Sequence, residues 1–138
     1  MNIDEPIIII EDDPDDRDII KALCAEIGIC NNLLFFENAP DALAYLRDTS
    51  VKPFILLCDI NMPGMDGLEM REEINKDEQL RKKSIPFIFF STAASDSQVA
   101  RAYDMTVQGF FLKENTFQET KETLEIIVKY WQRCKHPR

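Results

Sequence analysis

Five short apolar segments, separated by longer amphipathic ones, restrict how this chain can fold more than any other feature. The apolar segments are rich in Ile and Phe and comprise residues 7–10, 33–36, 54–58, 87–90 and 110–112. Apolar runs of this length are typical of strands that are covered on both faces. The amphipathic segments predict helices over residues 15–27, 40–48, 68–75, 98–105 and 117–133. Repeated βα units of this kind predict an α/β fold, with five parallel strands and helices on both faces.

The size and charge of the chain limit its organisation and its partners. A chain of 138 residues has room for one hydrophobic core, so we expect a single domain over residues 1–138. The 25 acidic and 16 basic residues give a net charge of −9, which disfavours nucleic acid and anionic membranes as partners. Four cysteines without C-x-x-C spacing argue against a disulfide framework or a zinc site. Because no apolar run is long enough to cross a bilayer, we expect a cytoplasmic protein.

Acidic residues follow two of the predicted strands directly. Glu11, Asp12 and Asp13 follow the first strand, and Asp59 follows the third. Because the carboxyl ends of parallel strands share one edge of a sheet, these side chains are expected to lie close together. Neighbouring carboxylates raise one another's pKa unless a cation compensates them, and Mg²⁺ prefers oxygen ligands. The sequence therefore predicts a magnesium site. Three further acids are predicted only to cap and solvate the next helix: Asp15, Asp16 and Asp18.

A hydroxyl and an amine follow the fourth and fifth predicted strands. They belong to Ser91, in FIFFSTAA, and to Lys113, in GFFLKEN. With Asp59 as nucleophile and carboxylates for a metal, these two groups complete the parts needed to bind and transfer a phosphoryl group.

The stretch DINMPGMDG, residues 59–67, carries a resemblance to a known family. With an acid pair after the first strand, a Ser after the fourth and a Lys after the fifth, the sequence resembles a response regulator receiver domain, the phosphoacceptor module of two-component signalling. The resemblance extends from residue 6 to about residue 130, and we expect this range to be the core of the domain. It implies a doubly wound, flavodoxin-like sheet with strand order 2-1-3-4-5.

The resemblance also implies a role for each residue of the site. Asp59 would be phosphorylated, and Asp12, Asp59 and the backbone carbonyl of Asn61 would bind Mg²⁺, with Glu11 completing the acidic pocket. Ser91 and Lys113 would contact the phosphoryl oxygens. The conformational switch would involve Ser91 and Phe110.

Some positions depart from the family pattern. The third acid, Asp13, leaves open whether the acid pair is Glu11 with Asp12 or Asp12 with Asp13. Glu114 follows Lys113 where the family usually has Pro, and Thr106 stands where many relatives have Gly. Phe110 lacks the hydroxyl of the Tyr that is frequent at its position.

These observations predict a stand-alone response regulator, a phosphoacceptor and not an enzyme beyond its own phosphotransfer and slow dephosphorylation. Its partners would be a sensor histidine kinase or histidine phosphotransfer protein and a downstream protein target. The fourth helix, fifth strand and fifth helix would form a face for a partner or a second copy, with Ile126 and Tyr130 as candidate surface residues and Phe117 facing the sheet. The YWQRC ending loosely resembles phytochrome-associated regulators.

Two other classes of function are open to a chain of this kind. A haloacid dehalogenase-type phosphatase also uses an Asp nucleophile and Mg²⁺, but that family normally has D-x-D where this chain has Asp59-Ile60-Asn61. A receiver-like interaction module that works without phosphate would not need Glu11, Asp12, Asp59, Ser91 and Lys113 together.

Overall fold

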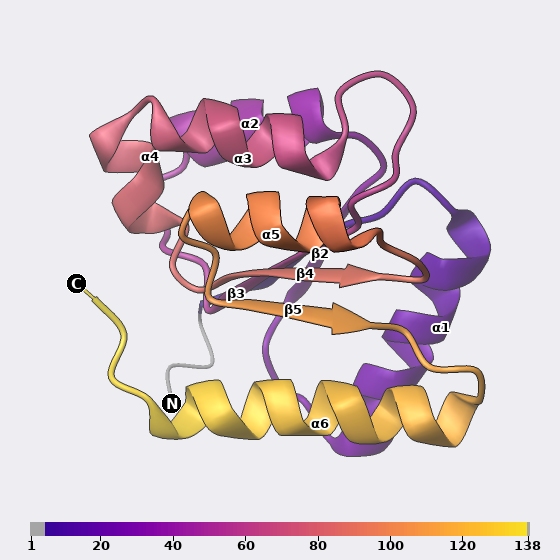
Figure 1. The fold of residues 1–138 in the computed structure, drawn as a ribbon. Coiled ribbons are helices and arrows are strands. Elements are labelled where there is room, and N and C mark those ends of the chain that lie inside the picture. The colour runs from indigo at the N-terminus through magenta and orange to yellow at the C-terminus, as the bar shows by residue number, and fades with distance from the viewer. Residues whose placement is uncertain (1–4, 138) are drawn as a thin grey trace.

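The computed structural model describes residues 5–137, which form one parallel sheet between two layers of helices (Figure 1). The strands are β1 (Ile7–Ile10), β2 (Leu33–Phe36), β3 (Ile55–Cys58), β4 (Phe87–Ser91) and β5 (Gly109–Leu112). The helices are α1 (Pro14–Ile27), α2 (Ala39–Asp48), α3 (Gly67–Asn75), α4 (Glu78–Lys83), α5 (Asp96–Asp104) and α6 (Phe117–Arg133). The strand order is β2-β1-β3-β4-β5, so the predicted doubly wound fold and its order are confirmed.

The helix α4 is the one element within residues 5–137 that the periodicity does not predict. Its six residues are too few to show a helical repeat of apolar positions. Asp77 begins it, because the Asp77 side chain accepts hydrogen bonds from the backbone N–H groups of Gln79 and Leu80. In the structure α4 lies between α3 and β4, so the fourth predicted helix is α5 and the fifth is α6.

The two faces of the sheet bury two separate clusters of apolar side chains. Ile8 and Ile10 of β1 belong to the cluster under α2, α3 and α5, whereas Ile7 and Ile9 belong to the cluster under α1 and α6. This alternation explains why the strands are apolar throughout, since each successive side chain meets a different helix layer. Among residues 5–137, no helix combines the length and apolar composition that crossing a bilayer requires.

Phe117 does not face the sheet, contrary to the prediction. It begins α6 and remains 46% exposed, while Leu124, Ile127 and Val128 make the buried stripe. The first turn of α6 extends beyond the end of β5 in Figure 1.

The spacing Thr116-x-x-Glu119 is typical of a capping box, but the start of α6 does not form the complete box. Thr116 accepts a hydrogen bond from the backbone N–H of Glu119, but the Glu119 carboxylate accepts from the Thr116 hydroxyl and not from its backbone. Ser95 and Gln98, at the start of α5, do form the complete box, with both reciprocal hydrogen bonds.

A buried arginine holds the C-terminal end of α5. Arg71 of α3 is only 1% exposed, and its Nε and Nη2 donate to the backbone oxygens of Met105 and Thr106 at 3.1 and 3.2 Å. Asn75 Nδ2 donates to the same Met105 oxygen at 3.0 Å. Thr106 has a φ of 61°, in the left-handed region that glycine usually occupies at a helix end. A cation and an amide from α3 therefore satisfy the carbonyl groups that this chain reversal exposes.

Gly67 allows the chain that follows β3 to pass close to the core. A Cβ at this position would lie 2.4 Å from the backbone oxygen of Asp59 and 2.8 Å from the ring of Phe89. Gly64, in the same loop, has a φ of 75° but open space around the position of a Cβ. The two glycines are thus required for different reasons, one for space and the other for backbone conformation.

We expect Gly67→Ala to lower the free energy of unfolding by about 3 kcal/mol, because backbone and core atoms would have to move. Gly64→Ala is the matched control and should cost about 1 kcal/mol, the strain of a left-handed alanine alone. Urea denaturation of both variants measures the difference. A Gly64→Ala variant that is as destabilised as Gly67→Ala would contradict this explanation.

Candidate functional site

The pairing of β1 with β3 places two acidic residues side by side. Ile10 is paired with Cys58, and the backbone N–H of Asp59 donates to the Ile10 oxygen at 2.9 Å. Glu11 and Asp59 are the residues that follow, so both lie at the carboxyl edge of the sheet. The strand order reverses at β1, whose neighbours are β2 and β3, and in open α/β sheets such a reversal creates a crevice.

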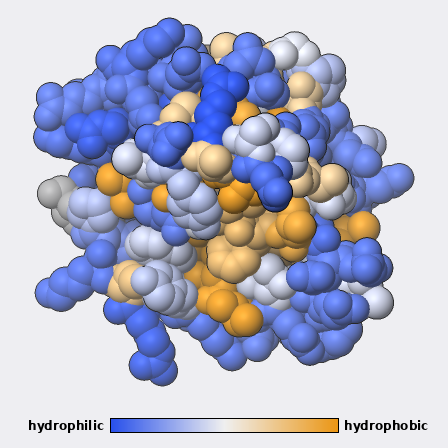
Figure 2. Space-filling model, viewed as in Figure 1, coloured by the Kyte–Doolittle hydropathy of each residue, from blue (hydrophilic) through white to orange (hydrophobic). Residues whose placement is uncertain are grey.

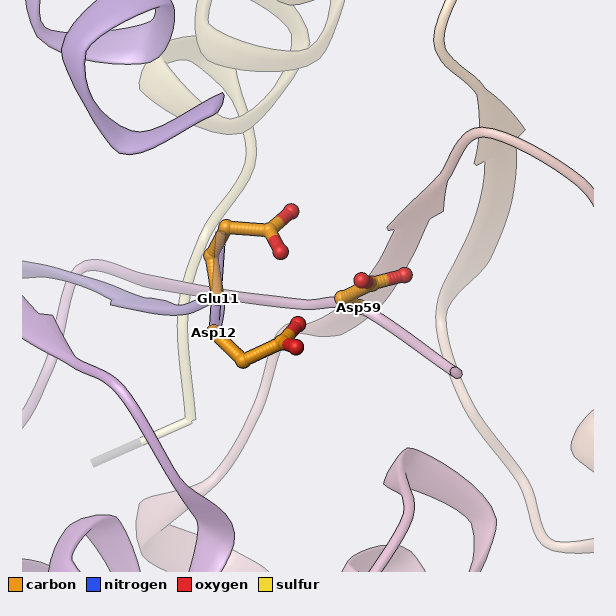
Figure 3. A group of neighbouring side chains, drawn as sticks. All are labelled: Glu11, Asp12 and Asp59. Atoms are coloured by element: carbon orange, nitrogen blue, oxygen red, sulfur yellow. The ribbon is translucent and has the colours of Figure 1, made fainter. Parts of the chain in front are cut away.

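Three carboxylates converge in this crevice. Glu11 and Asp12 come from the end of β1 and Asp59 from the end of β3, and one oxygen of each lies within 4.8 Å of the others (Figure 3). Glu11 and Asp59 are buried, and Asp12 is half-buried. Asp13 turns away to begin α1, because its side chain accepts the backbone N–H of Asp15 at 2.8 Å. Of the two alternative acid pairs, the structure therefore brings Glu11 and Asp12 to Asp59.

Ser91 binds the carboxylate of Asp59 directly. Its hydroxyl donates to Asp59 Oδ1 at 2.5 Å, and the Ser91 side chain is fully buried at the end of β4. One oxygen of a buried carboxylate thus already has a partner.

Lys113, after β5, lies between two acids. Its ammonium donates to Glu11 Oε1 and to Asp16 Oδ2, the latter at 3.2 Å, and also lies over the ring of Phe90. The side chain is only 8% exposed, although no Pro follows it in the sequence. Glu11 and Asp16 together hold the ammonium of Lys113 in place.

The role of Asp16 corrects the prediction that it only caps and solvates a helix. Asp16 lies in the first turn of α1, which starts at the end of β1 and therefore borders the crevice. Arg17 is a second residue that the prediction missed, since its Nη1 donates to the Glu11 backbone oxygen at 2.7 Å. The only sequence feature that could have revealed them is their place in the helix that begins beside the acid pair.

Burial and charge oppose each other at this site. Burial raises the pKa of Glu11 to about 7, although the hydrogen bond and the charge of Lys113 act to lower it. For Lys113, burial by itself lowers the pKa, but Glu11, Asp16 and Asp59 outweigh it and hold the pKa above its ordinary value. The ammonium therefore stays protonated at neutral pH and neutralises part of the acidic cluster.

Asn61 and Phe110 lie on the α5 side of the crevice. The Asn61 side chain contacts the chain between β4 and α5, where its Nδ2 donates to the Ala93 oxygen at 3.0 Å. Phe110 is half-buried, with its ring centroid 5.5 Å from that of Phe89. Each of the predicted site residues is thus at the carboxyl edge of the sheet or in the β5 strand beside it.

The donor set of the crevice fits a hard divalent cation. It offers carboxylate oxygens from Glu11, Asp12 and Asp59, which are the ligands that Mg²⁺ and Mn²⁺ prefer. Two of the three carboxylates are buried, so a cation would relieve repulsion that water cannot screen.

Known proteins are similar to this chain over most of its length. The model of the response regulator receiver domain matches residues 7–125. The probable methanogenesis regulatory protein FilR2 of Methanothrix harundinacea is 30% identical over 129 residues, which cover 91% of this chain and 82% of that protein. The chemotaxis protein CheY-3 of Vibrio cholerae is 30% identical over 130 residues, 94% of this chain and 95% of that one.

Solved structures share the fold. The phosphorylated cyanobacterial phytochrome response regulator RcpA superimposes with a TM-score of 0.88 at 24% identity, covering 98% of this chain and 99% of that one. The Mn²⁺-bound response regulator Rcp1 gives a TM-score of 0.85 at 22% identity over 97% and 99% of the two chains. The match of the family over most of the sequence, together with the confirmed strand order, shows that this chain belongs to the response regulator receiver domain family, the phosphoacceptors of two-component signalling.

Proposed function

We propose that this chain accepts a phosphoryl group on Asp59 from the phosphohistidine of a sensor histidine kinase or a histidine phosphotransfer protein. One observation carries the proposal. Asp59 is a buried carboxylate at the carboxyl end of β3, with a hydroxyl donor bound to it and two further carboxylates within 4.8 Å. A purely structural carboxylate would not need so many ionisable neighbours in a buried crevice.

The chemical step follows from these neighbours. A carboxylate oxygen of Asp59 attacks the phosphorus atom, the bond from phosphorus to the imidazole nitrogen of the donor breaks, and that nitrogen retains the electron pair. Ser91 and Lys113 then donate hydrogen bonds to the phosphoryl oxygens, which carry the charge that has been transferred. Lys113 already has its pKa held above the ordinary value, so it meets the phosphoryl group as a cation.

Glu11, Asp12, Asp59 and the backbone carbonyl of Asn61 would hold Mg²⁺. When bound, the metal supplies positive charge next to the phosphoryl oxygens. The fit rests on the three converging carboxylates. The response regulator Rcp1, which shares this fold, has been crystallised in a Mn²⁺-bound form.

We infer a phosphoacceptor and not a turnover enzyme, with residues 1–138 as one receiver domain. A haloacid dehalogenase-type phosphatase needs a second acid two residues after its nucleophile. Here that residue is Asn61, whose amide is engaged with Ala93 and Gln98 and has no ionisable group to serve as a general acid or base at neutral pH. A module that works without phosphate leaves the cluster of Glu11, Asp12 and Asp59 unexplained.

Output would pass through the face made by α5, β5 and α6. Figure 2 shows apolar side chains gathered on this side of the molecule, between the two helices. Ile126 and Tyr130 are 63% and 61% exposed there, and Tyr103 of α5 is 52% exposed. A downstream protein or a second copy of the chain would cover them, and the shift of Ser91 toward the phosphoryl group, with repacking of Phe110, would change the face.

Asp59→Asn should abolish phosphorylation by a small acyl phosphate in the presence of Mg²⁺, because the amide cannot act as the nucleophile. Intact-protein mass spectrometry measures the added phosphoryl group. Asp104→Asn, an exposed position far along α5, is the charge-matched control and should be modified like the wild type. Undiminished modification of Asp59→Asn would show that another residue is the acceptor.

Asp12→Asn should weaken Mg²⁺ binding at least about 10-fold, since it removes one charged ligand of the metal. Asp13→Asn should leave the affinity close to that of the wild type, because Asp13 caps α1 and points away from the cluster. Calorimetric titration with Mg²⁺ distinguishes them. The reverse order of effects would establish the alternative acid pair, Asp12 with Asp13.

The affinity for Mg²⁺ should fall as the pH drops from about 8 to about 6. Glu11 accounts for the direction of this change, because its pKa of about 7 lets protons compete with the metal for its carboxylate between these pH values. Glu11→Gln should bind Mg²⁺ more weakly but lose this pH dependence. Calorimetric titrations with Mg²⁺ at several pH values test this prediction. If the affinity of Glu11→Gln changed with pH as steeply as that of the wild type, the dependence would belong to another group.

A further inference from the structure

The side chain of Asn61 connects the loop after Asp59 to the start of α5. Its Nδ2 donates to the Ala93 backbone oxygen at 3.0 Å, and its Oδ1 accepts a hydrogen bond from Gln98 Nε2 at 3.2 Å. Gln98 lies in the first turn of α5, 37 residues further along the chain. Neither contact is needed for the metal or the nucleophile, since only the backbone carbonyl of Asn61 has a role in the proposed function.

Gln98 uses both ends of its amide. Its Oε1 accepts the backbone N–H of Ser95 at 2.9 Å, which is half of the capping box, and its Nε2 reaches Asn61. The residue that fixes the beginning of α5 therefore also fixes the loop of the acidic site. A shift of the first turn of α5 cannot leave Asn61 undisturbed unless this hydrogen bond breaks.

The contacts continue to the phosphoacceptor. Ala93, which accepts from Asn61, lies two residues after Ser91, and the Ser91 hydroxyl binds Asp59 Oδ1 at 2.5 Å. Hydrogen bonds therefore connect Asp59 with Ser91 and Ala93 with Asn61, and the chain itself connects Ser91 with Ala93 and Asn61 with Asp59. Gln98 of α5 is bonded to this network through Asn61.

The opposite end of α5 is held by Arg71 and Asn75, as described above. Arg71 is buried and bonded to two successive backbone oxygens, whereas the first turn of α5 is solvent-exposed at Ser95, Asp96 and Ser97. The N-terminal end of α5 is therefore exposed and is the end connected to the site.

We infer that Gln98 is a positioning residue that couples the loop after Asp59 to the first turn of α5 through the side chain of Asn61. The inference rests on the proposed function, because it takes the backbone of Asn61 as a metal ligand. By linkage, metal at the acidic site and a protein partner at the first turn of α5 affect each other's affinity to the same extent. This route reaches α5 through the side chain of Asn61, whereas the proposed switch acts through Phe110.

Gln98→Met tests the inference, because methionine keeps the length of the side chain but cannot donate to Asn61. The expected result is an affinity for Mg²⁺ that is between about 2-fold and about 5-fold weaker, since the loop then has to be ordered when the metal binds. Ser95→Ala is the matched control. It weakens the cap of α5 by removing the bond from the Gln98 backbone N–H but leaves the Asn61 contact in place, so its Mg²⁺ affinity should stay close to that of the wild type.

An Asn61→Ala background separates this coupling from a general loosening of α5. In that background Gln98→Met should cause no further loss of Mg²⁺ affinity, because its partner is already absent. Calorimetric titration with Mg²⁺ alone supplies the affinities. Amide hydrogen exchange over residues 96–100 should slow when Mg²⁺ binds the wild type and should not respond in Gln98→Met.

Four outcomes would overturn the inference. Equal losses in Gln98→Met and Ser95→Ala would assign the effect to capping, and additive losses in the double variant would show that Gln98 does not act through Asn61. Wild-type affinity in Gln98→Met, in a protein that still binds Mg²⁺ and is phosphorylated on Asp59, would overturn the coupling alone. A wild-type protein that binds no Mg²⁺ would overturn the proposed function as well.

Discussion

The in-register pairing of β1 with β3 is the constraint on which the rest of the site depends. It fixes Glu11 beside Asp59 at the edge of the sheet and leaves neither carboxylate room to escape into water. The resulting repulsion has to be balanced by nearby cations, and Lys113 supplies one from the far strand of the sheet. Lys113 balances only part of the repulsion between the carboxylates. Additional positive charge would lower that repulsion further, so the crevice favours the binding of a metal cation.

Much of this arrangement could be predicted from the sequence because it is local. Continuous apolar runs indicate the five strands, and the acids, the serine and the lysine stand directly after these runs in the sequence. A residue that immediately follows a parallel strand has little choice of position, so Asp59, Ser91 and Lys113 were expected at one edge. The strand order came from the family resemblance, since hydrophobic pattern alone does not say which strand lies next to which.

The parts that the sequence did not predict depend on side chains reaching across the fold. Asp16 and Lys113 are 97 residues apart, and Asn61 and Gln98 are 37 apart, with no pattern that links either pair. Their meeting depends on where α1 and α5 pack on the sheet, which is settled only by tertiary contacts. The prediction for Phe117 was wrong for a related reason. Helical periodicity identifies an apolar stripe on a helix but does not show how far the sheet extends beneath that stripe.

Arg71 and Thr106 have a consequence for how the sequence can change over time. The left-handed Thr106 and the buried guanidinium lie 35 residues apart but share one hydrogen-bonding arrangement. An apolar residue in place of Arg71 would leave the Thr106 carbonyl without this donor, whereas a glycine at position 106 would relieve the backbone strain and keep that carbonyl, so that of the contacts with Arg71 only the 3.5 Å one of the Thr106 hydroxyl would be lost. The dependence is therefore one-sided: position 106 can change to glycine while Arg71 stays, but the loss of Arg71 removes a donor from two successive backbone carbonyl groups whichever residue stands at position 106.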